Sequence, residues 1–582
     1  MKRFLYGKSS AALLGSGLAM VLGTAAVAQT ASQITPPTFR PSLPRVEGSV
    51  VFSGDAGLAA PPGADRLFVT ISGVVVEGGF PELSTAEAAL VARLTGGPVP
   101  VSEIFAAAQD LEAAYAQAGY VLVRVVLPAQ NLSDGDRLRL VVVDGFIERI
   151  DTEGVPGRIR GRITAVTDPL IGERRLTLAE IERRLLIAGD SYGVALRSAL
   201  SAGDQPGGAV LIVDARFREI TGFVALDNTL SDALGTWTLS TGFEANSLLG
   251  LGETWYFRAS GYPGGDFTDG LGAFIGDNPR SRTIAAGVVF PIGNDGLEFN
   301  IEGTASQTTP DFSDEFNTGS NFQRLALRLD YPWIQSRELN VNVQAAFDFQ
   351  SEEQYLITDG GDQPFSKDRL RILRFAGDAA WQLESGALVT GGAIASFGLD
   401  AFGARGVEDT TPELPLSRQG ADADFQKLEV VATYAQTLRD HLGFSLYARG
   451  QTSFGQALAQ SEQIGVASFQ ELSTFDAGSI GGDEGWIVRG NILSPWGFET
   501  ARAPLIITPY AFAATSGLRL VDPTVFEESR LQASSVGIGV ELNAILDPDF
   551  SQATVTFEYG RGYRDDGLPD ENRATLVASY QF

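Results

Sequence analysis

The chain of 582 residues contains no cysteine, one histidine (His441) and two methionines. Without cysteine it can form neither a disulfide nor a thiolate metal site. A single imidazole excludes multi-histidine metal centres and leaves only one candidate base for a hydrolytic triad. Basic residues are also few, because 43 Lys and Arg stand against 71 Asp and Glu, for a net charge of −28. This balance argues against a nucleic-acid-binding surface.

One serine-hydrolase pattern is present, from Gly189 to Gly193 around Ser191. A nucleophile elbow needs a strand before its serine and a helix after it. The sequence predicts the reverse order, a helix over 177–188 and a strand over 192–200. No P-loop or EF-hand spacing is present either. We therefore predict that the protein is not an enzyme and that it has no cofactor and no metal site.

Long apolar runs are absent except at the N-terminus. Lys2, Arg3 and Lys8 precede an apolar stretch at about 11–27, which ends in an Ala-Val-Ala triplet. This order is typical of an export signal, cleaved here after Ala28, and an uncleaved anchor helix is the weaker alternative. Beyond this stretch no apolar run reaches the length of a membrane-spanning helix, so any further membrane contact is expected to be peripheral or through a β-barrel.

Residues 29–64 contain six prolines, and they predict an extended, partly disordered linker without a long helix. Two modules with one element order (strand, helix, helix, strand, strand) follow, at 65–144 and 145–216. The helices and strands expected in them lie at 67–71, 84–94, 102–118, 120–127 and 137–143, and then at 146–151, 158–166, 177–188, 192–200 and 209–213.

From residue 217 apolar and polar residues alternate with period 2, as in 325–331, 339–349 and 553–559. A soluble β-sandwich would show the same alternation. The length of the region, the export signal and the nature of the last strand favour a membrane barrel. At about 10 residues per spanning strand, residues 217–582 predict a transmembrane antiparallel β-barrel of about 16 strands.

The last strand carries an apolar row that ends with Tyr580 and Phe582. Such a row is similar to the closing strand and the assembly signal of bacterial outer-membrane barrels. A barrel removes its free edges by pairing its last strand with its first, so a chain that ends inside a strand makes physical sense. Tyr580 and Phe582 are therefore expected to form the C-terminal assembly signal.

Several further stretches occur in the order found in one family. They are Ala118-Gly119-Tyr120-Val121-Leu122-Val123-Arg124 with Leu127-Pro128-Ala129-Gln130, Gly193-Val194-Ala195-Leu196-Arg197-Ser198, Leu226-Asp227-Asn228, Asn246-Ser247-Leu248-Leu249-Gly250-Leu251-Gly252, and Ser461-Glu462-Gln463 ahead of Gly482-Asp483-Glu484-Gly485-Trp486. With them the chain resembles the two-partner secretion transporters, the haemolysin secretion/activation family. Members of this family are outer-membrane barrels preceded by two polypeptide-transport-associated (POTRA) domains.

The resemblance implies a signal peptide (1–28), a linker (29–64), two POTRA domains (65–144 and 145–216) and a barrel (217–582). It implies an outer-membrane pore with periplasmic N-terminal domains. The POTRA domains would capture an unfolded secreted protein by strand addition, and the pore would pass it to the cell surface without ATP. The alternatives are an assembly factor that inserts other outer-membrane proteins and a passive porin, against which the two modules argue.

The partners implied by the resemblance are an adhesin-like or haemolysin-like exoprotein, outer-membrane lipid and the barrel-assembly machinery, and nucleic acid is not among them. Contacts with the exoprotein are expected within 120–127, 137–143, 158–166 and 177–200. The residues singled out there are Tyr120, Arg124, Gln130 and Arg197.

Two departures from the family pattern stand out. The family carries a Val-Arg-Gly-aromatic tetrad in its sixth outer loop, and the arginine pairs inside the lumen with an acid on a neighbouring strand. Here the tetrad falls on Leu472-Ser473-Thr474-Phe475 and the acid on Ala514, so both charges are absent together. Val488-Arg489-Gly490 lies where the family has a strand, and we interpret it as a chance match to the tetrad. The proline-rich linker also predicts that the family's N-terminal plug helix is absent.

Overall fold

The structure is a computed structural model that describes residues 29–36, 50–52, 60–264, 270–311, 317–501 and 503–582. The expected signal peptide lies outside these residues. The chain divides into two compact units, one of residues 44–217 with 250–252, and one of the remaining residues. Each unit is described by itself. Among the described residues no helix combines the length and the apolarity that crossing a membrane requires.

The first unit begins with a module in which two helices cover a small sheet. The sheet has the order β3-β6-β5, with β3 parallel and β5 antiparallel to β6, and β2 pairs separately with β4. The elements of this module are η1 (Ala64–Arg66), β2 (Phe68–Thr70), β3 (Gly73–Glu77), η2 (Pro81–Leu83), α2 (Ser84–Leu94), β4 (Pro98–Pro100), α3 (Val101–Gln117), β5 (Arg124–Val126) and β6 (Arg137–Val143).

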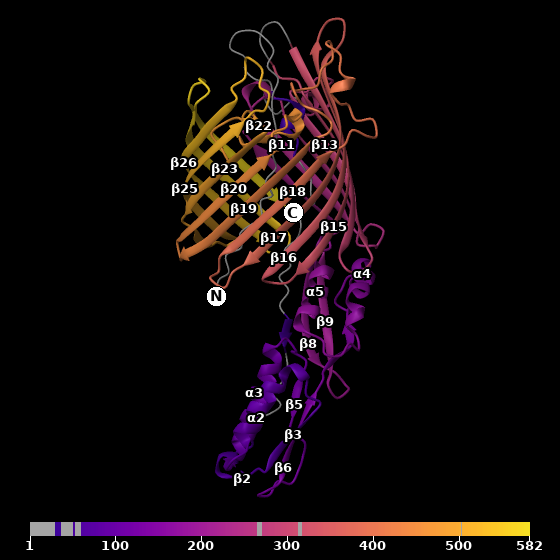
Figure 1. The fold of residues 1–582 in the computed structure, drawn as a ribbon, viewed down its shortest axis with the longest axis vertical. Helices are drawn as coiled ribbons and strands as arrows, with labels where there is room; N and C mark the ends of the chain where they lie inside the picture. The colour runs from indigo at the N-terminus through magenta and orange to yellow at the C-terminus, as the bar shows by residue number, and fades with distance from the viewer. Residues whose placement is uncertain (1–28, 37–49, 53–59, 265–269, 312–316, 502) are drawn as a thin grey trace. The chain divides into compact units, whose positions relative to one another are not determined.

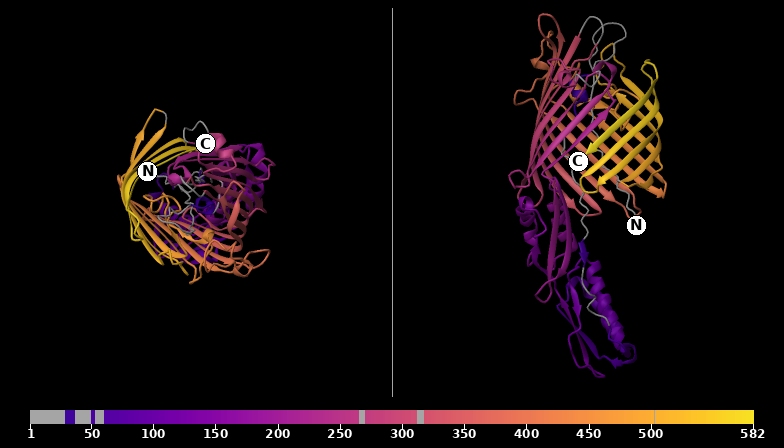
Figure 2. Two further views of the ribbon diagram at one scale, coloured as in Figure 1. Left: turned by 90° about the horizontal axis from the view of Figure 1, so that it is seen from above. Right: turned by 180° about the vertical axis from the view of Figure 1, so that it is seen from behind.

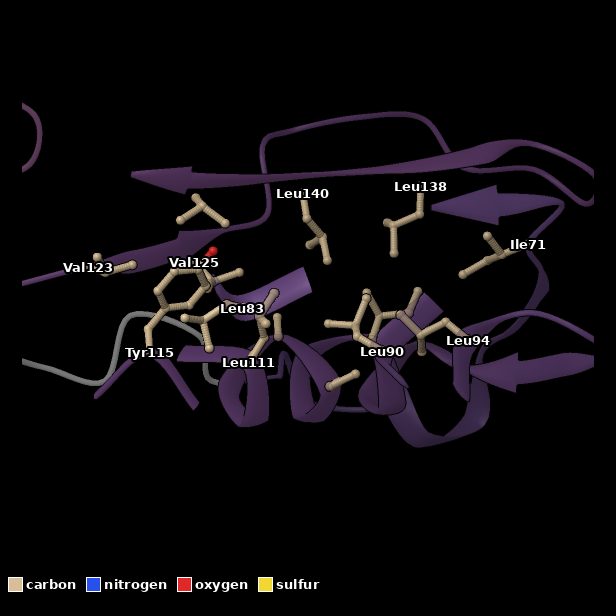
Figure 3. Close-up of a cluster of buried hydrophobic side chains, with 14 of the residues drawn as sticks. Ile71, Leu83, Leu90, Leu94, Leu111, Tyr115, Val123, Val125, Leu138 and Leu140 are labelled. Atoms are coloured by element: carbon tan, nitrogen blue, oxygen red, sulfur yellow. The ribbon is translucent and has the colours of Figure 1, made fainter. Parts of the chain in front are cut away.

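The helices pack on the sheet because their apolar residues recur at helical spacing. Ile104, Ala108, Leu111 and Tyr115 of α3 are all buried. They meet alternate residues of the strands, such as Leu138 and Leu140, and Figure 3 shows this core from the side. The valine-rich strand β3 is an element that the sequence analysis did not predict.

The second module repeats this plan with a four-stranded sheet of order β1-β8-β9-β7. Its helix α5 begins with a capping box, in which Thr177 Oγ1 accepts from the Glu180 amide and Glu180 accepts from the Thr177 amide. The outer strand β1 comes from the expected linker and pairs in parallel with β8. The elements are β1 (Val50–Phe52), β7 (Phe146–Asp151), α4 (Gly157–Thr167), η3 (Asp168–Leu170), α5 (Leu178–Gly189), β8 (Val194–Ala202) and β9 (Gly208–Phe217).

The second unit is a closed antiparallel barrel with 16 spanning strands (Figures 1 and 2). The short strand β24 (Trp496–Glu499) adds a hairpin to β25. The spanning strands are β10 (Ile220–Asp227), β11 (Thr238–Asn246), β12 (Thr254–Gly261), β13 (Ser281–Ile292), β14 (Leu297–Thr308), β15 (Asn317–Gln335), β16 (Leu339–Ile357), β17 (Gln363–Gln382), β18 (Leu388–Gly398), β19 (Gln426–Arg439), β20 (Leu442–Thr452), β23 (Glu484–Leu493), β25 (Pro504–Arg519), β26 (Arg530–Asp547), β27 (Ser551–Arg564) and β28 (Glu571–Gln581).

Alternation along the strands separates lumen from lipid. In β14 the buried residues Asn300, Glu302 and Thr304 face inward, while Ile301 between them is exposed on the outside. The barrel closes where β28 pairs with β10, and the backbone groups of Phe582 and Gly222 exchange hydrogen bonds at 2.9 and 3.0 Å. The prediction of a barrel of about 16 strands, preceded in the chain by two small α/β modules, is thus confirmed.

Candidate functional site

The sixth outer loop, residues 453–483, connects β20 to β23 and folds into the barrel. It contains η6 (Gln460–Glu462) and a small hairpin of β21 (Ile464–Gly465) and β22 (Gly481–Gly482). Loop residues Leu472, Phe475 and Ile480 form a buried apolar cluster with residues of the wall, Ile487, Ala514, Leu518 and Ala533 among them. This apolar cluster helps to fix where the loop rests.

Ion pairs also hold the loop in place. It carries four carboxylates, Glu462, Glu471, Asp476 and Asp483, and it has no lysine or arginine. Each carboxylate pairs with a cation outside the loop. The pairs are Glu462 with Arg374 (2.7 Å) and Lys427 (2.9 Å), Glu471 with Arg449 (2.8 Å), Asp483 with Arg418 (3.5 Å), and Asp476 with Arg573.

The loop tetrad predicted from the sequence lies on one row of register partners across four neighbouring strands. Arg489 of β23 is opposite Ala514 of β25, which is opposite Ser535 of β26, which is opposite Gly562 of β27. Register partners in a sheet point to the same face. The row therefore forms a continuous seat on the lumen side of the wall.

Each member of the tetrad contacts this seat or its surroundings. Leu472 and Phe475 share the apolar cluster with Ala514. Ser473 Oγ accepts from Arg489 Nη1 at 3.2 Å, and Thr474 Oγ1 lies 2.5 Å from the Ser535 hydroxyl oxygen. The two sequence-predicted positions, the tetrad and Ala514, are therefore brought together.

Gly562 shows how closely the tetrad fits. A Cβ on Gly562 would lie 2.5 Å from Thr474 Oγ1 and 2.6 Å from Phe475 Cζ, so only glycine leaves room for the tip of the loop.

Val488-Arg489-Gly490 lies in strand β23, as expected, and is not the loop tetrad, but the sequence did not predict that Arg489 contacts Ser473 of the loop. One signal in the sequence could have found it. Trp486, Val488 and Gly490 have the spacing of residues that face the lipid. Arg489, which lies between Val488 and Gly490, is therefore expected to point toward the lumen.

Residues 29–36 also lie inside the barrel, where the short helix α1 (Ala31–Ile34) contacts β14, β15 and η6 (Figure 2). The Ser32 amide and hydroxyl donate to the Glu352 carboxylate of β16 at 3.1 and 2.7 Å. Arg324 donates to the carbonyl of Pro36 at 3.1 Å. The expectation of an extended linker without a plug helix is therefore wrong for residues 29–36. Proline excludes a long helix but allows a single turn before Pro36.

The N-terminal segment also contacts the loop. The side-chain amide of Gln29 donates to the backbone carbonyl of Ala477, and Gln33 packs against Gly478, whose φ of 78° favours glycine. A cavity of about 240 Å³ lies beside this contact. Its walls are rich in hydroxyl groups from β11, β12 and β13, such as Ser240, Ser260 and Thr283. The lumen thus holds two chain segments and a polar space between them and the wall.

In the first unit, Tyr120 takes part in the junction of the two modules. Its hydroxyl donates to Glu82 at 2.6 Å, and Glu82 also pairs with Arg175 of the second module. The hydrogen bond to Glu82 raises the pKa of Tyr120, and the hydrogen bond from Tyr120 lowers the pKa of Glu82. Behind this junction, burial raises the pKa of Tyr115 to about 12. A backbone hydrogen bond of 2.8 Å, from Leu178 to Gly119, also joins the modules.

Of the other predicted partner contacts, Arg124 and Arg197 lie on strands, and Gln130 lies in the segment between β5 and β6. Arg124 of β5 pairs with Glu112 of α3 at 3.3 Å, and Glu112 also accepts the Val125 amide at 2.9 Å, at the outer edge of the sheet. The side-chain amide of Gln130 bonds the backbone of Arg139 at 2.8 and 2.9 Å. Arg197 is an exposed residue of β8. For these residues a role in binding a partner stays a prediction.

Strand addition is restricted by the sheet order. The expected contact segment 137–143 is β6, which pairs with β3 over 137–141 and with β5 only over 141–143. Strand addition needs unpaired backbone groups, and a role of this segment in binding a partner stays a prediction. The edge of β8 is covered by β1. In the first module β5 stands at an outer position of its sheet.

The serine-hydrolase pattern has the context predicted from the sequence, because Ser191 follows helix α5 and precedes strand β8. His441 lies at the turn between β19 and β20, where its ring stacks on Trp496 with the centroids 3.8 Å apart. Among the described residues there is no group of three or more His, Asp or Glu that could hold a metal ion.

Known proteins share this architecture. The family described as haemolysin secretion/activation protein ShlB/FhaC/HecB matches residues 207–515, more than half of the chain, and a ShlB-type POTRA domain matches residues 69–145. The outer membrane transporter CdiB of Escherichia coli is 23% identical over 456 residues, 77% of this chain and 72% of that protein. The heme/hemopexin transporter protein HuxB of Haemophilus influenzae (strain 86-028NP) is 23% identical over 175 residues, 30% of this chain and 31% of that protein.

The solved structure of CdiB from Escherichia coli has the same fold, with a TM-score of 0.67 at 21% sequence identity over 95% of this chain and 94% of that one. The barrel, the modules before it and the family match agree with the resemblance seen in the sequence. The chain therefore belongs to the haemolysin secretion/activation protein family, the two-partner secretion transporters of the outer membrane, and it is not an enzyme.

Proposed function

We propose that the transporter passes an unfolded exoprotein through its lumen, and that residues 29–36 leave the lumen while the sixth outer loop stays in place. The observation that carries this proposal is the unequal attachment of the two segments. The contacts described for residues 29–36 are chiefly hydrogen bonds, such as those to Glu352 and from Arg324. The loop has an apolar cluster and four carboxylates in ion pairs.

The free energies that hold the two segments support the release of residues 29–36 before the sixth outer loop. An intramolecular hydrogen bond contributes about 1 kcal/mol net, so a few of them hold residues 29–36 by only a few kcal/mol. Each buried apolar side chain of the loop contributes about 1.5–3 kcal/mol, and breaking a buried ion pair costs about 3–5 kcal/mol more. An exoprotein that competes for lumen contacts displaces the weaker segment first.

We infer that capture takes place at the first POTRA domain, on the edge of β5, where strand addition needs only the displacement of the Glu112 side chain from the Val125 amide. The domain limits that go with this proposal are 1–28, 29–64, 65–144, 145–216 and 217–582, with 29–36 assigned to the lumen. Folding of the exoprotein outside the cell gives the movement its direction, and no nucleotide is required.

The cargo that fits the family best is an adhesin-like or haemolysin-like exoprotein. Lipid surrounds the barrel, where Trp255, Trp333 and Trp381 are exposed on the outer face. Tyr580 and Phe582 on the closing strand are the groups that the barrel-assembly machinery would read during biogenesis.

The proposal is tested by deleting the gene and comparing the secreted, surface and outer-membrane proteins of the cell with those of the parent. Transport predicts the loss of one large exoprotein from the supernatant or the surface, with other outer-membrane proteins unchanged. A broad loss of outer-membrane proteins would instead support an assembly factor. Unchanged profiles in both fractions would contradict both functions.

A further inference from the structure

We propose that Arg489, a residue of the barrel wall, positions the tip of the sixth outer loop, so that in this chain the wall supplies the guanidinium and the loop supplies its acceptors. This is the reverse of the polarity implied by the family pattern, in which the arginine belongs to the loop. It concerns the seating of the loop and does not depend on which exoprotein is carried.

One nitrogen of the Arg489 guanidinium, Nη1, is directed at the loop, while Nε donates to Asn491 Oδ1 of the same strand at 3.0 Å. Nη1 donates to the carbonyl oxygens of Phe469 (3.1 Å) and Glu471 (3.3 Å) and to Ser473 Oγ (3.2 Å). The Arg489 side chain is only 5% exposed. A guanidinium presents five N–H donors in a planar fork, so one side chain can hold several loop acceptors together.

The charge of Arg489 is balanced within the wall. Its Nη2 pairs with Glu558 of β27, and the hydroxyl of Tyr510 donates to the same carboxylate at 2.7 Å. The ring of Phe512 lies under the guanidinium, 4.1 Å from Cζ to the centroid. Because Glu558 compensates the charge, the donors that remain are available for neutral loop acceptors. A loop without any cation can therefore still be fixed by a buried arginine.

The neighbours of Arg489 leave space for this arrangement. Ala514, opposite Arg489 in register, packs with Leu472 and Phe475. Arg489 itself bridges Ser473 to Glu558. The acid that complements the loop tip is thus Glu558 on β27 rather than a residue at position 514.

The seating of the tip can be measured through an engineered disulfide. Thr474→Cys with Ser535→Cys replaces two hydroxyl oxygens that lie 2.5 Å apart, and the chain has no other cysteine. The rate of disulfide formation in the purified full-length protein reports how often the tip rests on β26. Adding Arg489→Gln is expected to slow it about tenfold or more, because the charge-assisted hydrogen bonds to the loop are lost. Arg561→Gln, which removes an exposed arginine of β27, is the matched control and is expected to change nothing.

A role of Arg489 limited to neutralising Glu558 is tested by Arg489→Gln with Glu558→Gln. Removal of both charges leaves no unpaired carboxylate, yet the proposal expects the disulfide rate to stay low. Recovery of the rate in this double variant would overturn the proposal.

Reversal of the polarity gives the complementary test. In Arg489→Gln with Ser473→Arg the loop supplies the guanidinium to Glu558, and the rate is expected to return to within about threefold of the parent. Ser473→Arg alone places two guanidiniums together and is expected to slow the reaction. A double variant that is no faster than the slower single variant would overturn the proposal. Each variant is first shown to be a folded barrel by its heat-modifiable mobility on a gel.

Discussion

Individual carboxylates decide how firmly the sixth outer loop is held. Glu471 is 1% exposed and pairs with Arg449, whose side chain is 2% exposed. Asp476, on the same loop as Glu471, pairs with Arg573 of β28, but the Asp476 side chain is 34% exposed. Burial makes the two pairs unequal, because water can solvate the partly exposed Asp476 carboxylate if its partner is lost, whereas the buried Glu471 carboxylate is shielded from solvent.

Replacement of Glu471 by Gln should therefore loosen the loop. Arg449 then keeps only a distant carboxylate, Glu429 at 3.6 Å. We expect the free energy of loop opening to fall by about 3 kcal/mol. Hydrogen exchange of residues 464–482 measures it. Asp476→Asn is the matched control, with an expected loss below about 1 kcal/mol. Equal losses in the two variants would contradict the account.

The junction of the two POTRA modules depends on pH through single residues. The pKa of Glu82 is lowered from 4.5, chiefly by its hydrogen bond from Tyr120. The carboxylate therefore stabilises the folded junction fully above pH 4.5, and the contribution is lost as the pH falls through the lowered pKa. The pKa of Tyr120 is raised from 10.0, so its contribution is present below pH 10 and is lost above it.

We expect the amide of Leu178, which bonds Gly119 across the junction, to lose hydrogen-exchange protection as the pH falls below 4.5. Protection factors corrected for the intrinsic pH dependence of exchange measure this. Glu82→Gln should remove the pH dependence. A profile that is the same in wild type and variant would show that another group controls the junction.

At the scale of elements, the edge of β5 is closed by a side chain. Glu112 accepts the amide of Val125, so an incoming strand must first displace this carboxylate. Glu112→Ala is expected to tighten binding of an extended, strand-forming peptide roughly fivefold, the equivalent of about 1 kcal/mol. Fluorescence anisotropy with the full-length transporter measures it.

Glu103→Ala, on the same helix, is the control for this prediction. Glu103 pairs with Arg93 at 2.6 Å and does not bond the edge of β5. If both variants bind the peptide equally, capture does not use this edge.

Elements with a clear period could be predicted from the sequence, and long-range contacts could not. Period-2 alternation located strands such as β15, β16 and β27, helical spacing located α3 and α5, and a helix-start signal at Ser84 located α2. The strand β3 was missed because its short valine run has no alternation to mark it. The helix α1 was missed because Glu352, which binds Ser32, lies 320 residues away.

The candidate site shows the same division. Counting from Ser461 placed the loop tetrad at 472–475 and the facing strand position at Ala514, and the structure brings them together. The role of Arg489 required the register of β23 with β25, which no local pattern contains.

At the scale of the whole molecule, the proposed transport cycle requires residues 29–36 to leave the lumen and the sixth outer loop to stay. Two matched disulfides separate these roles in a chain that has no cysteine. Thr35→Cys with Ser306→Cys ties the N-terminal segment to β14, where the two hydroxyls are hydrogen-bonded. Thr474→Cys with Ser535→Cys ties the loop to β26. The oxidising periplasm allows both disulfides to form.

The most direct test is the amount of exoprotein secreted by cells that carry each disulfide, before and after addition of a reductant. The disulfide at positions 35 and 306 is expected to stop secretion until it is reduced, and the disulfide at positions 474 and 535 is expected to leave secretion unchanged. Normal secretion with the first disulfide in place, or a reducible block from the second, would contradict the proposed transport cycle.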